Sequence, residues 1–223
     1  MAKLKTLGII LDGNRRFARE HNLPLVEGHR RGAAKVKEVL GWAKELGIKT
    51  VFIYAFSTEN WHRSKVEIAA LMLVLEEFLK TKVPELIENQ TRLLSIGDLT
   101  RLPPRLKKII DEAMITTKNG KKFTLVVALS YGGRAEIVAA AKTFAARGGT
   151  SEKEFNECLW TAGLPDPDLI IRTGGEKRLS NFLPWQAVYS ELYFTPTYWP
   201  ALTRVEFELI VKDYAARQRR FGR

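Results

Sequence analysis

The residues best suited to chemistry stand directly after the first apolar run of the chain. Residues 7–11 are apolar and bounded by turn-forming residues, which predicts a buried strand. Asp12-Gly13-Asn14 is a turn signal, and helix-forming residues resume at Arg15. The first N–H groups of a helix are unpaired and attract anions, and Gly13 lets the backbone approach one closely. The turn therefore predicts a phosphate or diphosphate site.

The charged side chains of this turn indicate how such a site would balance its charge. Arg15, Arg16 and Arg19 add positive charge. Asp12 would repel a phosphate unless a divalent cation lay between the two groups. The stretch thus indicates a metal-assisted diphosphate site. The alternative is a turn followed by a solvated, arginine-rich helix, and this stretch alone does not decide between them.

The elements that would position these residues follow from the alternation of apolar runs with helical patterns. Further strands are predicted at 49–56, 92–96, 123–129, 169–171 and 188–194. Helices are predicted at 30–46, 64–88, 103–113 and 134–146 and after 203, with Pro84 expected to kink or interrupt the second of these. This order predicts an α/β fold with a central, mostly parallel six-stranded sheet covered by helices on both faces.

Two more polar loops should meet the first one at the same edge of the sheet. Ligands of such sheets bind beyond the carboxyl ends of the strands, where the loops beginning at Asp12, Ser57 and Arg172 converge. Residues 57–63 combine hydroxyl, carboxylate, amide, aromatic and cationic side chains, whereas 172–181 combines two arginines with a flexible Gly-Gly pair. Guanidinium groups match phosphate oxygens. Each loop alone is consistent with a solvated surface loop, but three at one edge favour a site.

Composition limits the classes of protein to consider. The chain has 223 residues, 45% hydrophobic and 27% charged, and we expect one domain over residues 1–223. A formal net charge of +11 favours acidic partners such as nucleic acid, anionic lipid or a phosphorylated substrate. One cysteine, Cys158, excludes an intramolecular disulfide framework. Because the sequence shows neither a signal peptide nor an apolar run near the roughly 18 residues of a membrane span, we expect a cytoplasmic protein with at most peripheral contact at the inner face of the membrane.

Several common ligand motifs are missing from the sequence. It contains no Gly-x-x-x-x-Gly-Lys-Ser/Thr loop and no Gly-x-Gly-x-x-Gly, which argues against a P-loop nucleotidase and weakens a dinucleotide site. His21, His29 and His62 lack zinc-ligand spacing. The Asp-Asp-x-x-Asp motif of helical prenyl transferases is also absent.

Longer motifs run from the first predicted strand to Phe221. They comprise residues 12–18, 28–29, 54–61, 96–98, 131–134, 171–182 and 185–194. Their order and spacing resemble those of the cis-prenyltransferases, typified by undecaprenyl diphosphate synthase. The resemblance implies a homodimer whose parallel-sheet fold holds an apolar tunnel. It also implies Mg²⁺-dependent condensation of isopentenyl diphosphate onto an allylic diphosphate, farnesyl diphosphate being the expected primer, to make a Z-polyprenyl diphosphate of the class used as glycan lipid carrier.

The same resemblance implies roles for individual residues. Asp12 would hold Mg²⁺ against the allylic diphosphate, and Glu191 would complete the metal site. The allylic diphosphate would be cradled by Gly13, Asn14, Arg15, Arg16, Phe17 and His29. The residues lining the reacting centre would be Ser57, Thr58, Glu59, Asn60, Trp61 and Arg63. Isopentenyl diphosphate would be bound by Arg172, Arg178, Leu179 and Ser180.

Some of these implied roles leave alternatives open. Asn60 is the position assigned to proton removal, but a neutral amide is a poor base, so diphosphate-assisted proton loss stays open. His29 is a lone histidine in a helix, which is more often structural than functional. Leu25 stands where the family usually has an arginine, which puts the identity of the allylic substrate in doubt. The tail Arg219-Arg220-Phe221-Gly222 resembles the family's C-terminal segment that reaches across the dimer.

The apolar residues near these motifs allow a tunnel for the growing chain. Its walls are predicted to be Leu71, Met72, Leu75, Leu125 and Val127, although each is also consistent with ordinary core. The small residues Ala55, Ala69 and Ala70 would leave such a tunnel open. Between Trp61 and Asp98 the sequence lacks the insertion that some very-long-chain members of the family carry, so the resemblance implies a product up to roughly undecaprenyl length. We expect the undecaprenyl class, with a short-chain Z-prenyl diphosphate as the alternative.

Two further classes compete with an enzyme. A non-catalytic partner subunit is disfavoured because Asp12, Asn14, Asn60 and Glu191 are all present. A nucleic-acid-binding module would explain the net charge and the five tryptophans, but no recognisable nucleic-acid motif supports it. We therefore expect no nucleic-acid partner.

Overall fold

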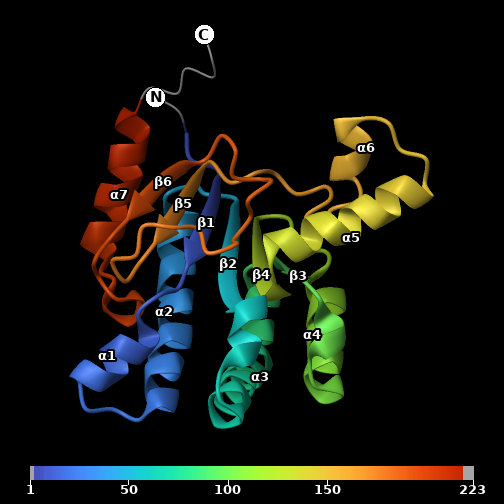
Figure 1. The fold of residues 1–223 in the computed structure, drawn as a ribbon. Helices are drawn as coiled ribbons and strands as arrows, with labels where there is room; N and C mark the ends of the chain where they lie inside the picture. The colour runs from blue at the N-terminus through green and yellow to red at the C-terminus, as the bar shows by residue number, and fades with distance from the viewer. Residues whose placement is uncertain (1–2, 218–223) are drawn as a thin grey trace.

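A computed structural model describes residues 3–217 and contains one central sheet (Figure 1). The strand order is β3-β4-β2-β1-β5-β6, and every pair in it is parallel. The strands are β1 (Thr6–Ile10), β2 (Thr50–Ser57), β3 (Thr91–Ile96), β4 (Phe123–Tyr131), β5 (Leu169–Arg172) and β6 (Glu191–Phe194). All five residues of β1 are buried, as is typical of strands covered on both faces. The predicted α/β fold with a six-stranded sheet is confirmed.

Helices alternate with the strands along the chain. They are α1 (Asn14–Glu20), α2 (Leu25–Glu45), α3 (Lys65–Glu88), α4 (Pro104–Thr117), α5 (Gly133–Ala146), α6 (Glu152–Asn156) and α7 (Arg204–Ala216), with 3₁₀ turns η1 (Thr58–His62), η2 (Leu99–Arg101) and η3 (Trp199–Ala201). Helices α2, α3, α4 and α7 bury apolar side chains in one large core with one face of the sheet. The other face packs against Phe182, Leu183 and neighbouring loop residues, so the expectation of helices on both faces holds for one face only.

Two element boundaries and one expected interruption differ from prediction for identifiable local reasons. Helix α2 begins at Leu25, five residues early, because Pro24 stands at its N-cap, where a residue without an N–H loses nothing. Strand β6 begins only at Glu191, because residues 187–190 form turns. Helix α3 continues through Pro84 to Glu88, so the predicted interruption is wrong.

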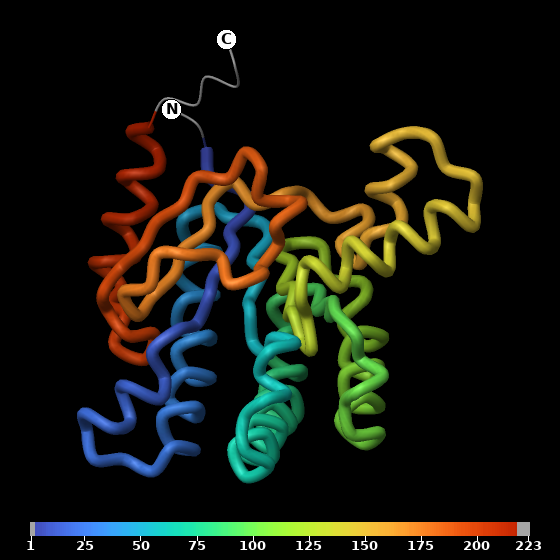
Figure 2. Tube along the Cα trace, viewed as in Figure 1, coloured from blue at the N-terminus to red at the C-terminus, as the bar shows by residue number. Residues whose placement is uncertain are grey.

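The strand register explains why the polar loops converge. Ile10 of β1 is paired with Tyr54 of β2 and with Arg172 of β5, so the three strands end at nearly the same level. Asp12, Ser57 and Arg172 therefore stand at one edge, as predicted. The chain trace shows α1 projecting from this edge, while α7 ends near the start of β1 at the opposite one (Figure 2). Within residues 3–217 no helix is long and apolar enough to cross a membrane.

A buried carboxylate supports the sheet beside this edge. Glu136 of α5 is fully buried and accepts hydrogen bonds from the Tyr131 hydroxyl (2.5 Å), the Gln186 amide (3.1 Å) and the Thr161 backbone N–H (3.2 Å). Burial and the nearby Glu136 carboxylate raise the pKa of Tyr131, so its hydroxyl stays a donor. The Glu136 carboxylate thus joins the end of β4 to two distant segments of the chain.

Glu136→Ala should lower the free energy of unfolding by about 3–5 kcal/mol, because three buried donors lose their acceptor. Urea unfolding of the two proteins measures this difference. The matched control is Glu112→Ala on the exposed side of α4, which should cost less than about 0.5 kcal/mol. A similar small cost at Glu136 would contradict the role given to its carboxylate.

Candidate active site

The three loops enclose a polar cavity of about 510 Å³ at the carboxyl edge of β1, β2 and β5. Its polar lining comes from all three loops and from α2: Asp12, Asn14, His29, Ser57, Glu59, Asn60, Arg63, Arg172, Ser180 and Asn181. An adjoining cavity of about 310 Å³ lies over α1 and is lined mainly by Asp12, Gly13, Asn14, Arg15, Arg16, Arg19, His29 and Arg63. Most of the predicted site residues are therefore brought together. Tyr54 and Asn181 line the first cavity although neither had an individual role predicted from the sequence, and Arg19 lines the second, as its charge suggested.

The turn before α1 depends on a glycine. Gly13 has a φ of +109°, in the left-handed region that side-chain-bearing residues rarely adopt. A Cβ atom built there would lie 2.8 Å from the Cβ of Tyr198, which is too close. Gly13 thus allows the loop to turn sharply enough to place Asp12 and Arg16 at the same cavity.

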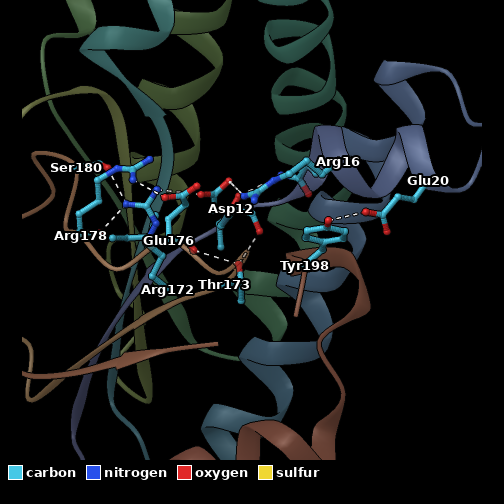
Figure 3. Close-up of polar contacts among 12 residues, drawn as sticks. Asp12, Arg16, Glu20, Arg172, Thr173, Glu176, Arg178, Ser180 and Tyr198 are labelled. Carbon is cyan, nitrogen blue, oxygen red and sulfur yellow. Dashed lines mark hydrogen bonds and ion pairs between the residues drawn. The ribbon is translucent and has the colours of Figure 1, made fainter. Parts of the chain in front are cut away.

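The carboxylate of Asp12 connects the first and fifth strands electrostatically (Figure 3). Its Oδ1 accepts a hydrogen bond from Arg16 Nη2 (3.1 Å), and its Oδ2 accepts one from Arg172 Nη2 (2.9 Å). Its backbone oxygen accepts from Thr173 Oγ1 (2.7 Å) and from the Trp199 N–H (3.0 Å). Asp12 therefore holds two arginines of separate loops side by side at the cavity.

Arg172 is fixed in place by several acceptors. Its side chain is only 6% exposed, and Nη1 donates to Ser180 Oγ (2.6 Å) and to the Arg178 carbonyl (2.5 Å). Its Nε is buried and has no hydrogen-bond partner within residues 3–217. A buried, unpaired donor beside a cavity is suited to an anionic ligand, because leaving it unsatisfied is unfavourable.

Tyr54 contacts the loop after β5, and the sequence did not indicate this role. Its hydroxyl lies 3.1 Å from the Tyr131 carbonyl oxygen and 3.3 Å from that of Ser180. Burial raises the pKa of Tyr54, which keeps the hydroxyl protonated as a donor. Ser180 and Asn181 both have positive φ, so their strained backbone needs such support. A tyrosine within an apolar strand pattern predicts core, and nothing in that pattern indicates the hydrogen bonds.

The loop after β2 is closed by a reciprocal pair of hydrogen bonds. Ser57 Oγ accepts from the Asn60 N–H (3.3 Å), and Asn60 Oδ1 accepts from the Ser57 N–H (3.1 Å). The amide oxygen of Asn60 is therefore already engaged by the backbone. Trp61 lies behind the loop: its Nε1 donates to Ser130 Oγ (2.9 Å), and Arg101 stacks on its ring at 4.9 Å.

A second buried carboxylate organises the cations near α2. Glu67 of α3 is 5% exposed, and its Oε1 lies 2.8 Å from Arg63 Nη1, 3.7 Å from Arg15 Nε and 3.9 Å from His29 Nε2. The sequence predicts a capping box from Ser64 and Glu67; Ser64 Oγ does accept from the Glu67 N–H, but the Glu67 carboxylate turns to Arg63 instead. The spacing of Ser64 and Glu67 along the chain predicts the helix cap, but it does not predict that Glu67 gathers these cations.

His29 is held in its neutral form by these surroundings. Burial and then Arg63 lower the pKa of His29 from 6.5 to about 4; Glu67 opposes them, and Arg15 adds a lesser lowering effect. Its Nε2 is buried and has no hydrogen-bond partner in the described part of the chain. A neutral imidazole with a free ring nitrogen at both cavities can donate to an anionic ligand.

Five other predicted site residues do not line these cavities. Phe17 is buried against His21 and Arg31, and Trp61 and Thr58 pack behind their loop. Leu179 packs against the apolar cluster that contains Phe182 and Leu183, and Arg178 is exposed and paired with Glu176. The rings of Phe17 and Trp61 are drawn into the wall by packing with their neighbours, whereas Arg178 lies at the exposed rim.

Glu191 lies far from Asp12 within one chain, so the described residues do not bring the two carboxylates of the predicted metal site together. It is paired in register with Leu169, which is paired with Leu7 of β1. Asp12 lies five residues beyond Leu7, roughly 16 Å further along the strand direction. Glu191 instead forms an ion pair with Arg217 of 2.8 Å. In residues 3–217 no group of three His, Cys, Asp or Glu side chains is placed to hold a metal.

An apolar cavity opens from the polar one. The two share Leu11, Asn14, His29, Ala55 and Leu71, and the apolar cavity has a volume of about 110 Å³. All five predicted wall residues line it: Leu71, Met72, Leu75, Leu125 and Val127. Ala55 also lines it, but Ala69 is exposed and Ala70 does not line it, so the expectation for these two is wrong.

The fold and the site together indicate which class of ligand this protein binds. Two arginine-lined cavities share the Asp12 carboxylate, and an apolar cavity opens beside them. This arrangement fits ligands that carry an anionic head and an apolar tail.

Comparison with known proteins identifies the family. Residues 10–222 match the family model described as "Putative undecaprenyl diphosphate synthase". The chain is 44% identical to the farnesyl-diphosphate-specific ditrans,polycis-undecaprenyl-diphosphate synthase of Micrococcus luteus, over 98% of this chain and 91% of that protein. It is 43% identical to an isoprenyl transferase of Rickettsia sibirica over the full length of both. The chain belongs to the undecaprenyl diphosphate synthase family and is a prenyl transferase of the cis-prenyltransferase type.

Solved structures agree with this assignment. Lavandulyl diphosphate synthase from Lavandula x intermedia, in complex with dimethylallyl diphosphate, superposes with a TM-score of 0.95 at 36% identity over 99% of both chains. A probable undecaprenyl diphosphate synthase from Campylobacter jejuni gives 0.86 at 35% identity over 100% of both. The resemblance predicted from the motifs is confirmed.

The buried His29 predicts a specific pH dependence of stability. Because its folded-state pKa is about 4 and its ordinary value 6.5, its stabilising contribution is complete above 6.5 and is lost as the pH falls toward 4. The loss amounts to roughly 3 kcal/mol. Urea unfolding between pH 7 and 4 should show this decline in the wild type and a smaller one in His29→Gln. His62→Gln, at an exposed position, is the control and should follow the wild type; parallel profiles for all three proteins would refute the assignment.

Proposed function

We propose that this enzyme condenses isopentenyl diphosphate onto an allylic diphosphate, with farnesyl diphosphate as primer, to make a Z-polyprenyl diphosphate of the undecaprenyl class. The observation that carries the proposal is the Asp12 carboxylate, which spans Arg16 of one cavity and Arg172 of the other. Two diphosphates bound there would lie side by side. The apolar cavity beginning beside them would receive the hydrocarbon chain.

Each diphosphate has its own set of donors in this proposal. The allylic diphosphate occupies the cavity over α1, among Gly13, Asn14, Arg15, Arg16 and His29. Arg19 lines the same cavity and adds positive charge to it. Isopentenyl diphosphate binds to Arg172 and Ser180, and the exposed Arg178 closes on it from the rim.

The donor set at Asp12 fits a magnesium ion brought in with substrate. Mg²⁺ is commonly held by one or two carboxylates, substrate phosphates and water, which suits a lone carboxylate between two diphosphate positions. The predicted Asp12–Glu191 pair is not available within one chain, so Asp12 is the residue that would hold the ion. When bound, Mg²⁺ would neutralise charge on the departing diphosphate.

The chain's own residues then account for the two halves of the reaction. The allylic carbon–oxygen bond breaks, and Arg15, Arg16 and His29 stabilise the charge that develops on the departing diphosphate. The allylic carbon bonds to the terminal alkene carbon of isopentenyl diphosphate, and one proton leaves. Because the Asn60 amide is a poor base whose oxygen is engaged by Ser57, we assign that proton to a diphosphate oxygen and give Asn60 the task of holding the loop.

We further propose a cytoplasmic homodimer. Apolar side chains are exposed on and beside the edge strand β6 and on α7: Val188, Tyr189, Leu192, Val205 and Leu209. An unpaired edge strand beside such a surface favours a second protein chain. The tail at 219–222 lies outside the described residues. Light scattering of the purified protein tests the dimer.

The activity assay separates this proposal from its competitors. Purified protein is incubated with Mg²⁺, labelled isopentenyl diphosphate, and dimethylallyl, geranyl or farnesyl diphosphate. Elongation of farnesyl diphosphate to about undecaprenyl length supports the proposal. A single addition to dimethylallyl diphosphate would instead favour a short-chain synthase, consistent with the small apolar cavity, and no product would favour a non-catalytic subunit.

Asp12→Asn should lower kcat/KM on the order of a hundredfold or more, because the metal loses its protein ligand while the site keeps its shape. Binding of inorganic pyrophosphate without Mg²⁺ should be retained or strengthened, since a negative charge has been removed. Steady-state kinetics and calorimetry measure the two effects. Asp111→Asn on α4 is the control and should match the wild type; Mg²⁺-dependent turnover at the wild-type rate in folded Asp12→Asn would disprove the assignment.

Ala55→Leu should shift the products toward shorter chains by at least one C5 unit, because Ala55 lines the junction of the polar and apolar cavities. Mass spectrometry of extracted products measures the shift. Ala69→Leu is the matched control: it makes the same change at an exposed position and should leave the product distribution unaltered. Identical product lengths from wild type and Ala55→Leu would show that the chain does not pass this junction.

A further inference from the structure

Helix α1 carries much of the positive charge of the allylic cavity, yet it lacks the features that stabilise a short helix. It has seven residues, a Gly13 N-cap without a side-chain hydrogen bond, and no acidic residue in its first turn. Helices this short are marginal on their own, and arginines near the positive end of the helix dipole are unfavourable. Arg15 and Arg19 also repel each other one turn apart. The helix must therefore be held by contacts from outside.

One side chain contacts this helix at its start, middle and end. The Tyr198 side chain packs against Gly13, and its ring lies 5.3 Å from the guanidinium carbon of Arg16. The Tyr198 hydroxyl donates a 2.6 Å hydrogen bond to Glu20 Oε1 at the last residue of α1 (Figure 3). This hydrogen bond raises the pKa of Tyr198, so the hydroxyl remains a donor.

The segment that carries Tyr198 is itself firmly attached to the site. The N–H of Trp199 donates to the Asp12 carbonyl (3.0 Å), and the N–H of Gly174 donates to the Thr197 carbonyl (2.8 Å). Trp199 is fully buried and donates from Nε1 to the Gly32 carbonyl of α2 (2.8 Å). The ring of Tyr198 is therefore fixed relative to both arginine-bearing loops.

We infer that Tyr198 is a positioning residue for Arg16, holding its guanidinium beside Asp12 in the orientation that receives the allylic diphosphate. The inference rests on the proposed function, in which Arg16 binds that diphosphate. Asp12 fixes one nitrogen of the guanidinium, and the ring covers one of its faces. The remaining N–H groups are thereby held ready for the ligand, which lowers the ordering cost of binding. Tyr198 does not itself line the cavities.

The test uses Tyr198→Leu, Tyr198→Phe, Arg16→Ala and the double variant Arg16→Ala/Tyr198→Leu. For each protein we would measure kcat, KM for both diphosphates, and the affinity for inorganic pyrophosphate. Tyr198→Leu should raise KM for the allylic diphosphate and Kd for pyrophosphate about fivefold or more, as expected from losing the cation–π contact that orients Arg16. KM for isopentenyl diphosphate and kcat should stay within about twofold. Tyr198→Phe keeps the ring and should restore most of the affinity.

The double variant separates positioning from a general structural effect. If Tyr198 acts through Arg16, Tyr198→Leu should cause no further loss in the Arg16→Ala background. Wild-type affinity in Tyr198→Leu, or a full additional loss in the double variant, would overturn the inference. Should Tyr198→Leu prove unfolded by circular dichroism, Tyr198→Met fills the same space without a π face and carries the same predictions. A normal KM in Arg16→Ala would instead contradict the proposed function.

Discussion

Asp12 accepts hydrogen bonds from Arg16 of α1 and Arg172 of β5, and the organisation of the site depends on this shared carboxylate. Two guanidinium groups on neighbouring loops repel each other unless a negative charge lies between them. Asp12 supplies that charge and lines both cavities, so Arg16 can face one cavity while Arg172 faces the other. Glu67 has the corresponding function for Arg63, Arg15 and His29 on the other side.

These charges can be concentrated only because the scaffold beneath them is rigid. The level ends of β1, β2 and β5 fix the three loops, and Gly13 permits the turn that brings α1 over them. Tyr54 supports the strained residues Ser180 and Asn181, and Glu136 fixes the end of β4 from which Tyr131 extends. Preorganised donors of this kind stabilise developing charge without reorganising at the moment of reaction.

The fold and the edge that carries the site could be predicted from the sequence because both follow from local pattern. Apolar runs alternating with amphipathic segments imply parallel strands with crossover helices, and such strands end at a common edge. The residues missed were Tyr54, Glu67 and Tyr198, whose contacts join positions distant in sequence. A tyrosine in an apolar strand and a glutamate at a helix cap each match a simpler local pattern that hides the long-range contact.

The misplaced predictions have a similar origin. Glu191 was paired with Asp12 through the family resemblance, whereas the strand register places the two residues far apart within one chain. Ala69 has the size of a tunnel residue, but the helical rotation of α3 leaves it exposed. Phe17 and Trp61 belong to the motifs, yet burial of their rings draws them behind the cavity. The size and type of a residue, and the motif it belongs to, do not determine where its side chain lies relative to the cavity.

The most direct measurement is a crystal structure of the protein with Mg²⁺, isopentenyl diphosphate and a non-reactive thio analogue of farnesyl diphosphate. The account predicts two diphosphates on either side of Asp12. One would contact Arg16 and the start of α1, and the other would contact Arg172 and Ser180, with the farnesyl tail entering between Ala55 and Leu71. Diphosphates bound away from Asp12, or a farnesyl tail lying outside the apolar cavity, would contradict it.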